Sequence, residues 1–207
     1  MIEENKLKDN SSGGVGSFIW EIIKIIALAF VIIVPIRVFL FQPFFVQGAS
    51  MEPNFEDGQY LIVNELGFKQ TNIGIGSSSL FTVDSFREME RQKVIVFHYP
   101  LDPSKYFIKR IIGLPGEKVQ IKDGEITIFN QANPNGFILD EKAYLSPSVK
   151  TAGELTVALK NDEFFVMGDN RMFSSDSRSW GPIKKKDVVG EILLRAWPLN
   201  EASFFNF

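Results

Sequence analysis

An apolar segment near the N-terminus, residues 18–41, constrains the fold of this 207-residue chain more than any other feature. As a helix it would be about 36 Å long, enough to cross about 30 Å of hydrocarbon. Its charge-free centre, residues 25–36, is short enough to suit a buried helix or the core of a signal peptide as well. We favour a transmembrane helix, because Glu21, Lys24 and Arg37 lie towards its two ends, where long side chains reach the headgroups.

The distribution of basic residues predicts the orientation of this helix. Lys6, Lys8 and Lys24 lie on its N-terminal side, whereas no basic residue occurs between Arg37 and Lys69. The N-terminus is therefore expected in the cytoplasm and the bulk of the chain outside it.

The sequence divides into three regions. Residues 1–17 are polar and rich in glycine and serine, which predicts a disordered cytoplasmic tail before the helix. Residues 42–207 hold short β-branched and aromatic runs between turn signals, and VQIKDGEITI predicts a hairpin around Asp123-Gly124. We expect this extracytoplasmic region to be mainly β, a coiled antiparallel sheet or partly open barrel. Residues 66–92 are expected to be an insertion, or a short helix around DSFREMER.

Composition excludes several chemistries. The absence of cysteine removes disulfides, thiol catalysis and cysteine-ligated metals, and a single histidine removes any His-x-x-x-His metal pair. We expect no metal and no cofactor. The formal net charge of −3 argues against a nucleic-acid partner. A Ser-His-Asp triad would have to use His98, which lies in a predicted buried strand, so an activated serine would need another base.

Two residues could carry catalysis. Ser50, in VQGASMEPNFEDG, follows Leu40 by ten residues, at most about 35 Å of extended chain, so it is tethered near the bilayer. It can be a plain turn residue or a nucleophile. Lys109 shares a strand face with Phe107 and Ile111. Burial there would lower its pKa by up to about 3–5 units and make it a general base, whereas on a solvated face it would stay charged.

Three ordered segments after the apolar helix resemble bacterial type I signal peptidases, the Ser-Lys endopeptidases that cut signal peptides from exported proteins. The segments are Ser50-Met51-x-Pro53, KRIIGLPGE from Lys109, and GDNRMFSSDSR from Gly168. The resemblance runs from about residue 18 to residue 199. Two departures are Asn54, where the family usually has Thr, and Gly48, where some members carry a hydroxyl that completes the oxyanion hole.

The resemblance implies that Ser50 is the nucleophile and Lys109 the general base. It also implies that the Ser174 hydroxyl orients the lysine and that Asp176 and Arg178 form an acidic–basic pair near the site. The other implied supporting residues are Met51, Pro53, Gly168, Asp169, Asn170 and Arg171.

The function implied by the resemblance is cleavage of preproteins after a small-x-small site, through an acyl-enzyme, at the bacterial plasma membrane. The implied partners are signal peptides and the lipid bilayer, and a link to the translocation machinery is compatible with that place. Two rivals stay open: a self-cleaving Ser-Lys regulator, which would lack the anchor, and a non-catalytic, membrane-tethered β module. Aromatic clusters at 39–45 and 203–207 allow core packing or contact with the membrane interface, and we favour the interface for the first.

Overall fold

The structure is a computed structural model, which describes residues 15–39, 41–68, 71–75, 78–83 and 85–205. It divides into two compact units with the boundary after Phe39, and each is considered by itself.

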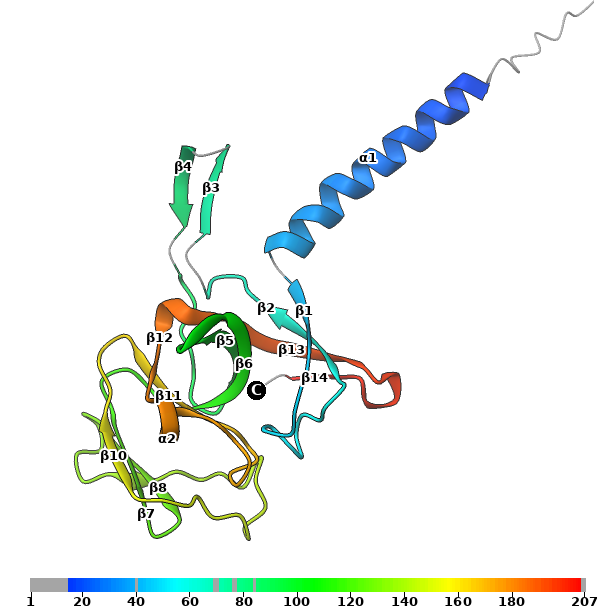
Figure 1. The fold of residues 1–207 in the computed structure, drawn as a ribbon. Helices are drawn as coiled ribbons and strands as arrows, with labels where there is room; N and C mark the ends of the chain where they lie inside the picture. Colours follow the sequence, from blue (N-terminus) through cyan, green and yellow to red (C-terminus); the bar gives the residue numbers. More distant parts are fainter. Residues whose placement is uncertain (1–14, 40, 69–70, 76–77, 84, 206–207) are drawn as a thin grey trace, which may run out of the picture. The chain divides into compact units, whose positions relative to one another are not determined.

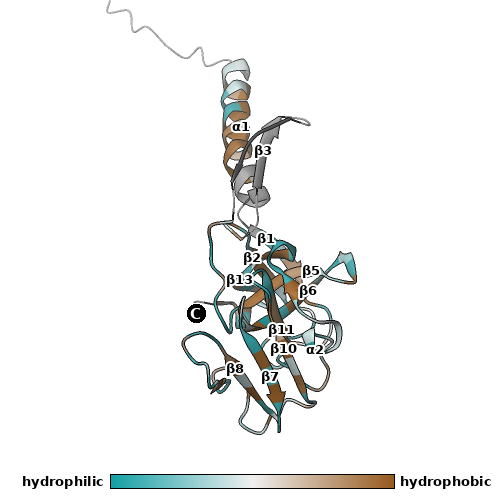
Figure 2. Ribbon diagram, turned by 90° about the vertical axis from the view of Figure 1, so that its left-hand side faces the viewer, coloured by the Kyte–Doolittle hydropathy of each residue, from teal (hydrophilic) through white to brown (hydrophobic). Residues whose placement is uncertain are grey.

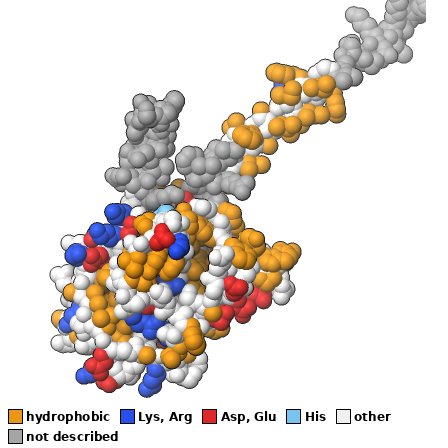
Figure 3. Space-filling model, viewed as in Figure 1, with side chains coloured by type: hydrophobic (Ala, Val, Ile, Leu, Met, Phe, Trp, Pro, Cys, Tyr) orange, Lys and Arg blue, Asp and Glu red, His pale blue; other side chains and the backbone are white. Residues whose placement is uncertain are grey.

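The first unit contains helix α1 (Val15–Phe39). The helix begins three residues before the predicted segment and ends two residues before its end. Residues 15–17, predicted as tail, therefore form its first turn, as expected once an apolar helix has nucleated. Most of its described residues are hydrophobic (Figure 2), and hydrophobic side chains make up most of the face seen in Figure 3. Among the described residues, it is the one helix long and apolar enough to cross a membrane. The remaining predicted tail, residues 1–14, lies outside the described residues.

The second unit is built on an open eight-stranded antiparallel sheet (Figure 1). Its main path runs β1-β2-β13-β5-β6-β11-β12, with β14 added to β13. The two ends of the path do not pair, so the sheet is not closed into a barrel, and the expected mainly β, antiparallel and open architecture is confirmed. The strands are β1 (Phe41–Phe45), β2 (Tyr60–Asn64), β5 (Val94–Tyr99), β6 (Asp102–Gly113), β11 (Glu163–Met167), β12 (Ile183–Lys184), β13 (Val188–Trp197) and β14 (Ser203–Phe204).

A smaller four-stranded sheet has the order β10-β7-β8-β9. Its central hairpin turns at Asp123 and Gly124, whose φ angles of 54° and 85° are those that a two-residue hairpin turn requires. The hairpin expected at these residues is therefore confirmed. The strands are β7 (Lys118–Lys122), β8 (Glu125–Phe129), β9 (Phe137–Ile138) and β10 (Leu155–Ala158).

The region expected to be an insertion forms a separate hairpin, β3 (Thr71–Ile75) with β4 (Ser78–Val83). The short helix expected around DSFREMER is wrong, because residues 85–90 have no helical structure. The N–H groups of Phe86 and Arg87 both donate to the Gly67 carbonyl, at 3.0 and 2.9 Å, instead of to carbonyls one turn earlier. Tertiary contacts thus determine the conformation of this segment. The short helices of the unit are α2 (Ser177–Trp180), η1 (Lys185–Asp187) and η2 (Leu199–Glu201).

The two aromatic clusters each divide between core and surface. Phe44 and Phe205 pack against the buried core cluster that contains Met51. Phe45 and Phe204 are exposed.

Candidate active site

Ser50 lies in the turn that follows β1. Buried neighbours of Ser50 pack into the core and fix the backbone of this turn. Met51 and Phe55 are each 1% exposed, and the Phe55 N–H donates to the Met51 carbonyl at 3.0 Å. Pro53 is exposed on the other side of the turn. The apolar side chain next to the serine thus anchors the turn, and the hydroxyl stays at the surface of the core.

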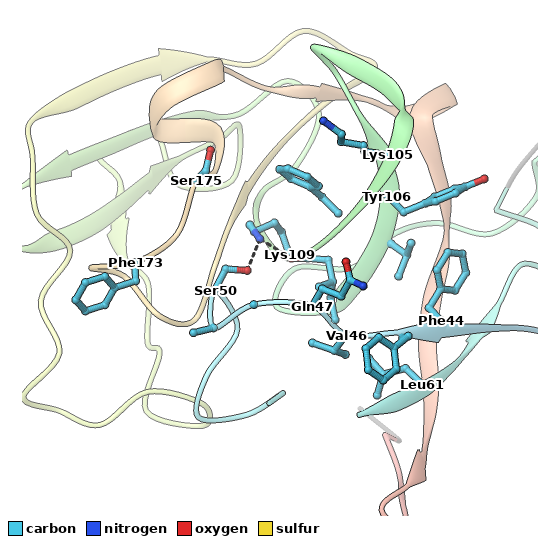
Figure 4. Close-up of a pocket in the computed structure, with 16 residues that line it drawn as sticks. Phe44, Val46, Gln47, Ser50, Leu61, Lys105, Tyr106, Lys109, Phe173 and Ser175 are labelled. Atoms are coloured by element: carbon cyan, nitrogen blue, oxygen red, sulfur yellow. Dashed lines mark hydrogen bonds between the residues drawn. The ribbon is translucent and has the colours of Figure 1, made fainter. Parts of the chain in front are cut away.

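Lys109 reaches this serine from β6, 59 residues along the chain. Its Nζ lies 2.7 Å from Ser50 Oγ and 2.8 Å from the Ile108 carbonyl oxygen (Figure 4). The ammonium position is also 5.5 Å from the centroid of the Phe107 ring. Lys109 is 3% exposed, so the burial that strand alternation indicated is found.

Burial changes the protonation of this lysine. It lowers the pKa of Lys109 to about 8, although the charges of Asp176 and Asp169 act in the opposite direction. At pH 7 about one lysine in ten is then neutral, against about one in 2,500 for a lysine of ordinary pKa. A neutral amine at hydrogen-bond distance from a hydroxyl can remove its proton.

A groove of about 700 Å³ opens in front of the two residues. One wall is the chain from Phe44 to Ser50, and the other is β6 from Lys105 to Lys109. The groove has an apolar floor, which is formed by Leu61 and Val96 together with Val46 and Ile108 from the two walls. Figure 4 shows Val46 and Leu61 on one side of Ser50 and Phe173 on the other.

A tight turn after β11 holds the serine segment from the side. The Asn170 N–H donates to the Ser50 carbonyl at 3.1 Å, and its side-chain amide donates to the Ala49 carbonyl at 3.0 Å. A Cβ atom on Gly168 would lie 2.3 Å from the Ser50 carbonyl oxygen and 2.2 Å from Ser174 Oγ. Only glycine allows this approach of the turn to the serine segment.

Comparison with known proteins identifies the family. The family described as "Signal peptidase, peptidase S26" matches residues 19–197. Signal peptidase I of Bacillus licheniformis is 35% identical, over 97% of both chains. This chain belongs to the signal peptidase family. Signal peptidase IB of Staphylococcus aureus (strain MRSA252) is 29% identical over 86% of this chain and 90% of that relative. A solved structure of a signal peptidase I from Enterococcus faecalis V583 is 30% identical, with a TM-score of 0.42 over 52% of this chain and 98% of that chain.

As a signal peptidase, the chain is a serine endopeptidase that removes signal peptides. The recognition of its family from three motifs is thus confirmed. Family membership alone does not assign roles to individual residues, which depend on the geometry of this chain.

The pair expected between Asp176 and Arg178 is present. Asp176 is fully buried and accepts from Arg178 Nε and Nη2, both at 2.8 Å, and from the Gly168 N–H at 3.1 Å. Burial raises the pKa of the Asp176 carboxyl, but the hydrogen bonds and charge of Arg178 outweigh it, and the pKa lies below its ordinary value. A carboxylate is therefore kept ionised close to the lysine.

Ser174 lies beside the site without the expected contact to Lys109. Its hydroxyl is buried against Gly168 and helps to lower the pKa of Asp176, yet it makes no hydrogen bond of good geometry with any described residue. Within that part of the chain, Lys109 Nζ bonds to Ser50 and Ile108 instead.

Arg171 connects the turn to a distant loop. Its Nε donates to the Gly168 carbonyl at 3.1 Å, and its Nη1 donates to Glu141 Oε2 at 2.9 Å and to the Thr151 hydroxyl. Sequence reasoning missed Glu141 and Thr151, and no motif marks them. It also missed Arg110. Its position as a charged residue inside an apolar strand was a signal that could have revealed it.

His98 is held away from this chemistry. Its Nδ1 lies 2.8 Å from the Pro103 carbonyl oxygen, and its ring packs on Tyr106 with 4.7 Å between centroids. It does not line the groove that contains Ser50 and Lys109.

Proposed function

We propose that Ser50 and Lys109 are the catalytic dyad of this signal peptidase. The observation that carries the proposal is the 2.7 Å separation between Lys109 Nζ and Ser50 Oγ at the edge of an apolar groove. Neutral Lys109 takes the Ser50 proton while Oγ attacks the carbonyl carbon of the last residue of the signal peptide. The resulting Lys109 ammonium protonates the leaving amine, and an acyl-enzyme remains. Lys109 then takes a proton from water, and the hydroxide attacks the ester carbon. The bond to Ser50 Oγ breaks, the Lys109 ammonium returns its proton to Oγ, and the signal peptide leaves with a free carboxylate.

The Ser50 N–H is the proposed donor to the oxyanion. Among the described residues, nothing accepts a hydrogen bond from it. The Gly48 N–H, by contrast, donates to Asp57 Oδ1 at 2.6 Å and is already engaged. The glycine at position 48 also supplies no hydroxyl, so a water molecule is the available second donor.

The groove supports recognition of an extended peptide with small side chains. β1 is the edge of the main sheet, and β6 pairs only with β5 over residues 106–109, so both walls offer unpaired backbone groups. In an extended peptide alternate side chains point the same way. The first and third residues before the cleaved bond would therefore face the apolar floor of Val, Leu and Ile side chains. We propose that these two positions hold the small residues of a small-x-small site.

We also propose that α1 anchors the chain in the bacterial plasma membrane, with its N-terminus in the cytoplasm and the catalytic unit, residues 42–207, outside. The length and exposed apolar surface of the helix support the anchor, and the basic residues support the direction. A site tethered close to lipid suits a substrate whose own signal peptide lies in the bilayer and that arrives from the translocation machinery.

The test is cleavage of a preprotein with a small-x-small site by the purified full chain in detergent. Ser50→Ala and Lys109→Met should each lose more than about a thousandfold in kcat/KM while keeping the wild-type circular dichroism spectrum. His98→Ala is the matched control and should stay within about twofold of wild type, since its ring does not line the groove. Near-normal activity of Lys109→Met would overturn the base assignment. Wild type that is inactive on several preproteins would favour a non-catalytic binding module.

A further inference from the structure

Two large apolar side chains stand exposed on the loop beside the nucleophile. Met172 is 72% exposed and Phe173 is 78% exposed, between the Gly168 turn and the buried Asp176. Neither side chain is used by the chemistry described above. An exposed aromatic ring next to a reactive serine is a candidate contact for a ligand.

The backbone of Phe173 is fixed relative to Ser50. Its N–H donates to the Asn170 carbonyl at 3.1 Å, which closes the turn. Asn170 in turn donates to the carbonyls of both Ser50 and Ala49. The ring is therefore carried on a turn that is bonded to the nucleophile segment, so the backbone that presents it is already ordered before a ligand binds.

Phe173 and Met172 differ in their position relative to the groove. Phe173 lines the groove that contains Ser50, and Met172 does not. Figure 4 shows the Phe173 ring on the opposite side of Ser50 from Phe44, Val46 and Leu61. The groove thus has an apolar floor on one side of the serine and a single aromatic ring on the other.

We propose that Phe173 binds the part of the preprotein that follows the cleaved bond, as a contact for the side chains of its first two or three residues. This rests on the proposed function. If the small residues of the signal peptide occupy the apolar floor, the chain must leave past the other side of Ser50, where Phe173 lies. A flat ring that a substrate covers would favour apolar or aromatic side chains at these positions.

Two substrates separate this role from others. Both carry the same residues before the cleaved bond. One continues for five residues with Leu or Phe at the second, and the other ends after one further residue, a glycine amide, and offers no side chain for Phe173 to contact. They are cleaved in detergent by the full-length wild type, by Phe173→Ala, by Phe173→Leu and by the matched control Met172→Ala, with melting temperatures measured alongside.

We expect Phe173→Ala to lower kcat/KM for the longer substrate by about fivefold, the size expected for losing part of the burial of a phenylalanine ring. Its kcat/KM for the glycine-amide substrate should not change. Phe173→Leu should recover part of the loss, and Met172→Ala should behave as wild type on both substrates.

An equal loss on both substrates would overturn the proposal in favour of a structural role. No loss on either substrate in detergent, with a loss for both variants after reconstitution in phospholipid vesicles, would assign the two side chains to the bilayer instead. If wild type cleaves neither substrate, the proposed function itself fails. If wild type and Phe173→Ala cleave both substrates equally well, only the proposed role of Phe173 is overturned.

Discussion

Arg110 and Asp169 form a buried ion pair that ties the strand carrying Lys109 to the turn that holds Ser50. Arg110 Nε donates to Asp169 Oδ1 at 2.8 Å and Nη2 donates to Oδ2 at 2.5 Å, with side chains 3% and 0% exposed. The Asn54 amide also donates to Asp169 Oδ2 at 2.9 Å. One carboxylate therefore joins the serine segment, the lysine strand and the turn.

Removing one partner should be costly. Asp169→Ala leaves the Arg110 charge buried, and we expect the free energy of unfolding to fall by about 3–5 kcal/mol. Denaturant unfolding measures this. In Arg110→Met/Asp169→Leu, no charge remains, and much of the loss should be recovered. Lys160→Ala, which removes the exposed partner of Glu163, is the control and should have no measurable effect. A cost below about 1 kcal/mol for Asp169→Ala would show that the pair does not hold the two segments together.

Activity should depend on the free-base form of Lys109. Because its pKa lies at about 8, kcat/KM should rise about tenfold per pH unit below pH 7 and level off above about pH 8. The measurement is kcat/KM for a short peptide from pH 5.5 to 10. An inflection near pH 6.5 that disappears in His98→Ala would instead point to the histidine as the base.

The burial of Lys109 should lower the stability of the protein. Its folded pKa of about 8 lies below its unfolded value of 10.5, so the unfolded state binds more protons between these values. The penalty is complete below pH 8, at about 3 kcal/mol, and disappears as the pH rises to 10.5. Lys109→Met should therefore be inactive yet more stable than wild type at pH 7, by up to this amount less its lost contacts.

The check is the difference in unfolding free energy between Lys109→Met and wild type at several pH values. The difference should shrink steadily from pH 8 to pH 10.5. A variant that is less stable than wild type at pH 7 would contradict the burial of a largely charged lysine.

The close approach at Gly168 should not tolerate a methyl group. In Gly168→Ala the new Cβ would meet the Ser50 carbonyl oxygen and Ser174 Oγ, so the turn must move away from the serine segment. We expect a loss of about 1–3 kcal/mol in stability and at least about a hundredfold in kcat, because the nucleophile is displaced. Gly16→Ala is the control, since no atom lies within 4 Å of a Cβ at Gly16. Wild-type kcat in Gly168→Ala would rule out this role of the turn.

The sequence by itself determined the local structure and identified Ser50 and Lys109 as candidate reactive residues. Residues 18–41 contain enough apolar side chains to define a helix, and strand alternation placed Lys109 on an apolar face. Asp123-Gly124 specified its hairpin turn, because both residues accept the left-handed backbone that the turn needs. These features depend on residues a few positions apart, which periodicity and turn chemistry describe. The family resemblance then added Ser50, Lys109 and the turn from Gly168 to Arg171.

Only the tertiary structure decided how these pieces meet. The contact between Ser50 and Lys109 depends on how distant turns and strands pack together, as do the ion pair of Arg110 with Asp169 and the attachment of Glu141 to Arg171. No local pattern encodes contacts between segments so far apart along the chain. Residues 85–90 show the same limit, since bonds to Gly67 replaced the expected helix. Burial, and with it the pKa of Lys109, follows from packing against side chains of other strands, and so appears only once the chain has folded.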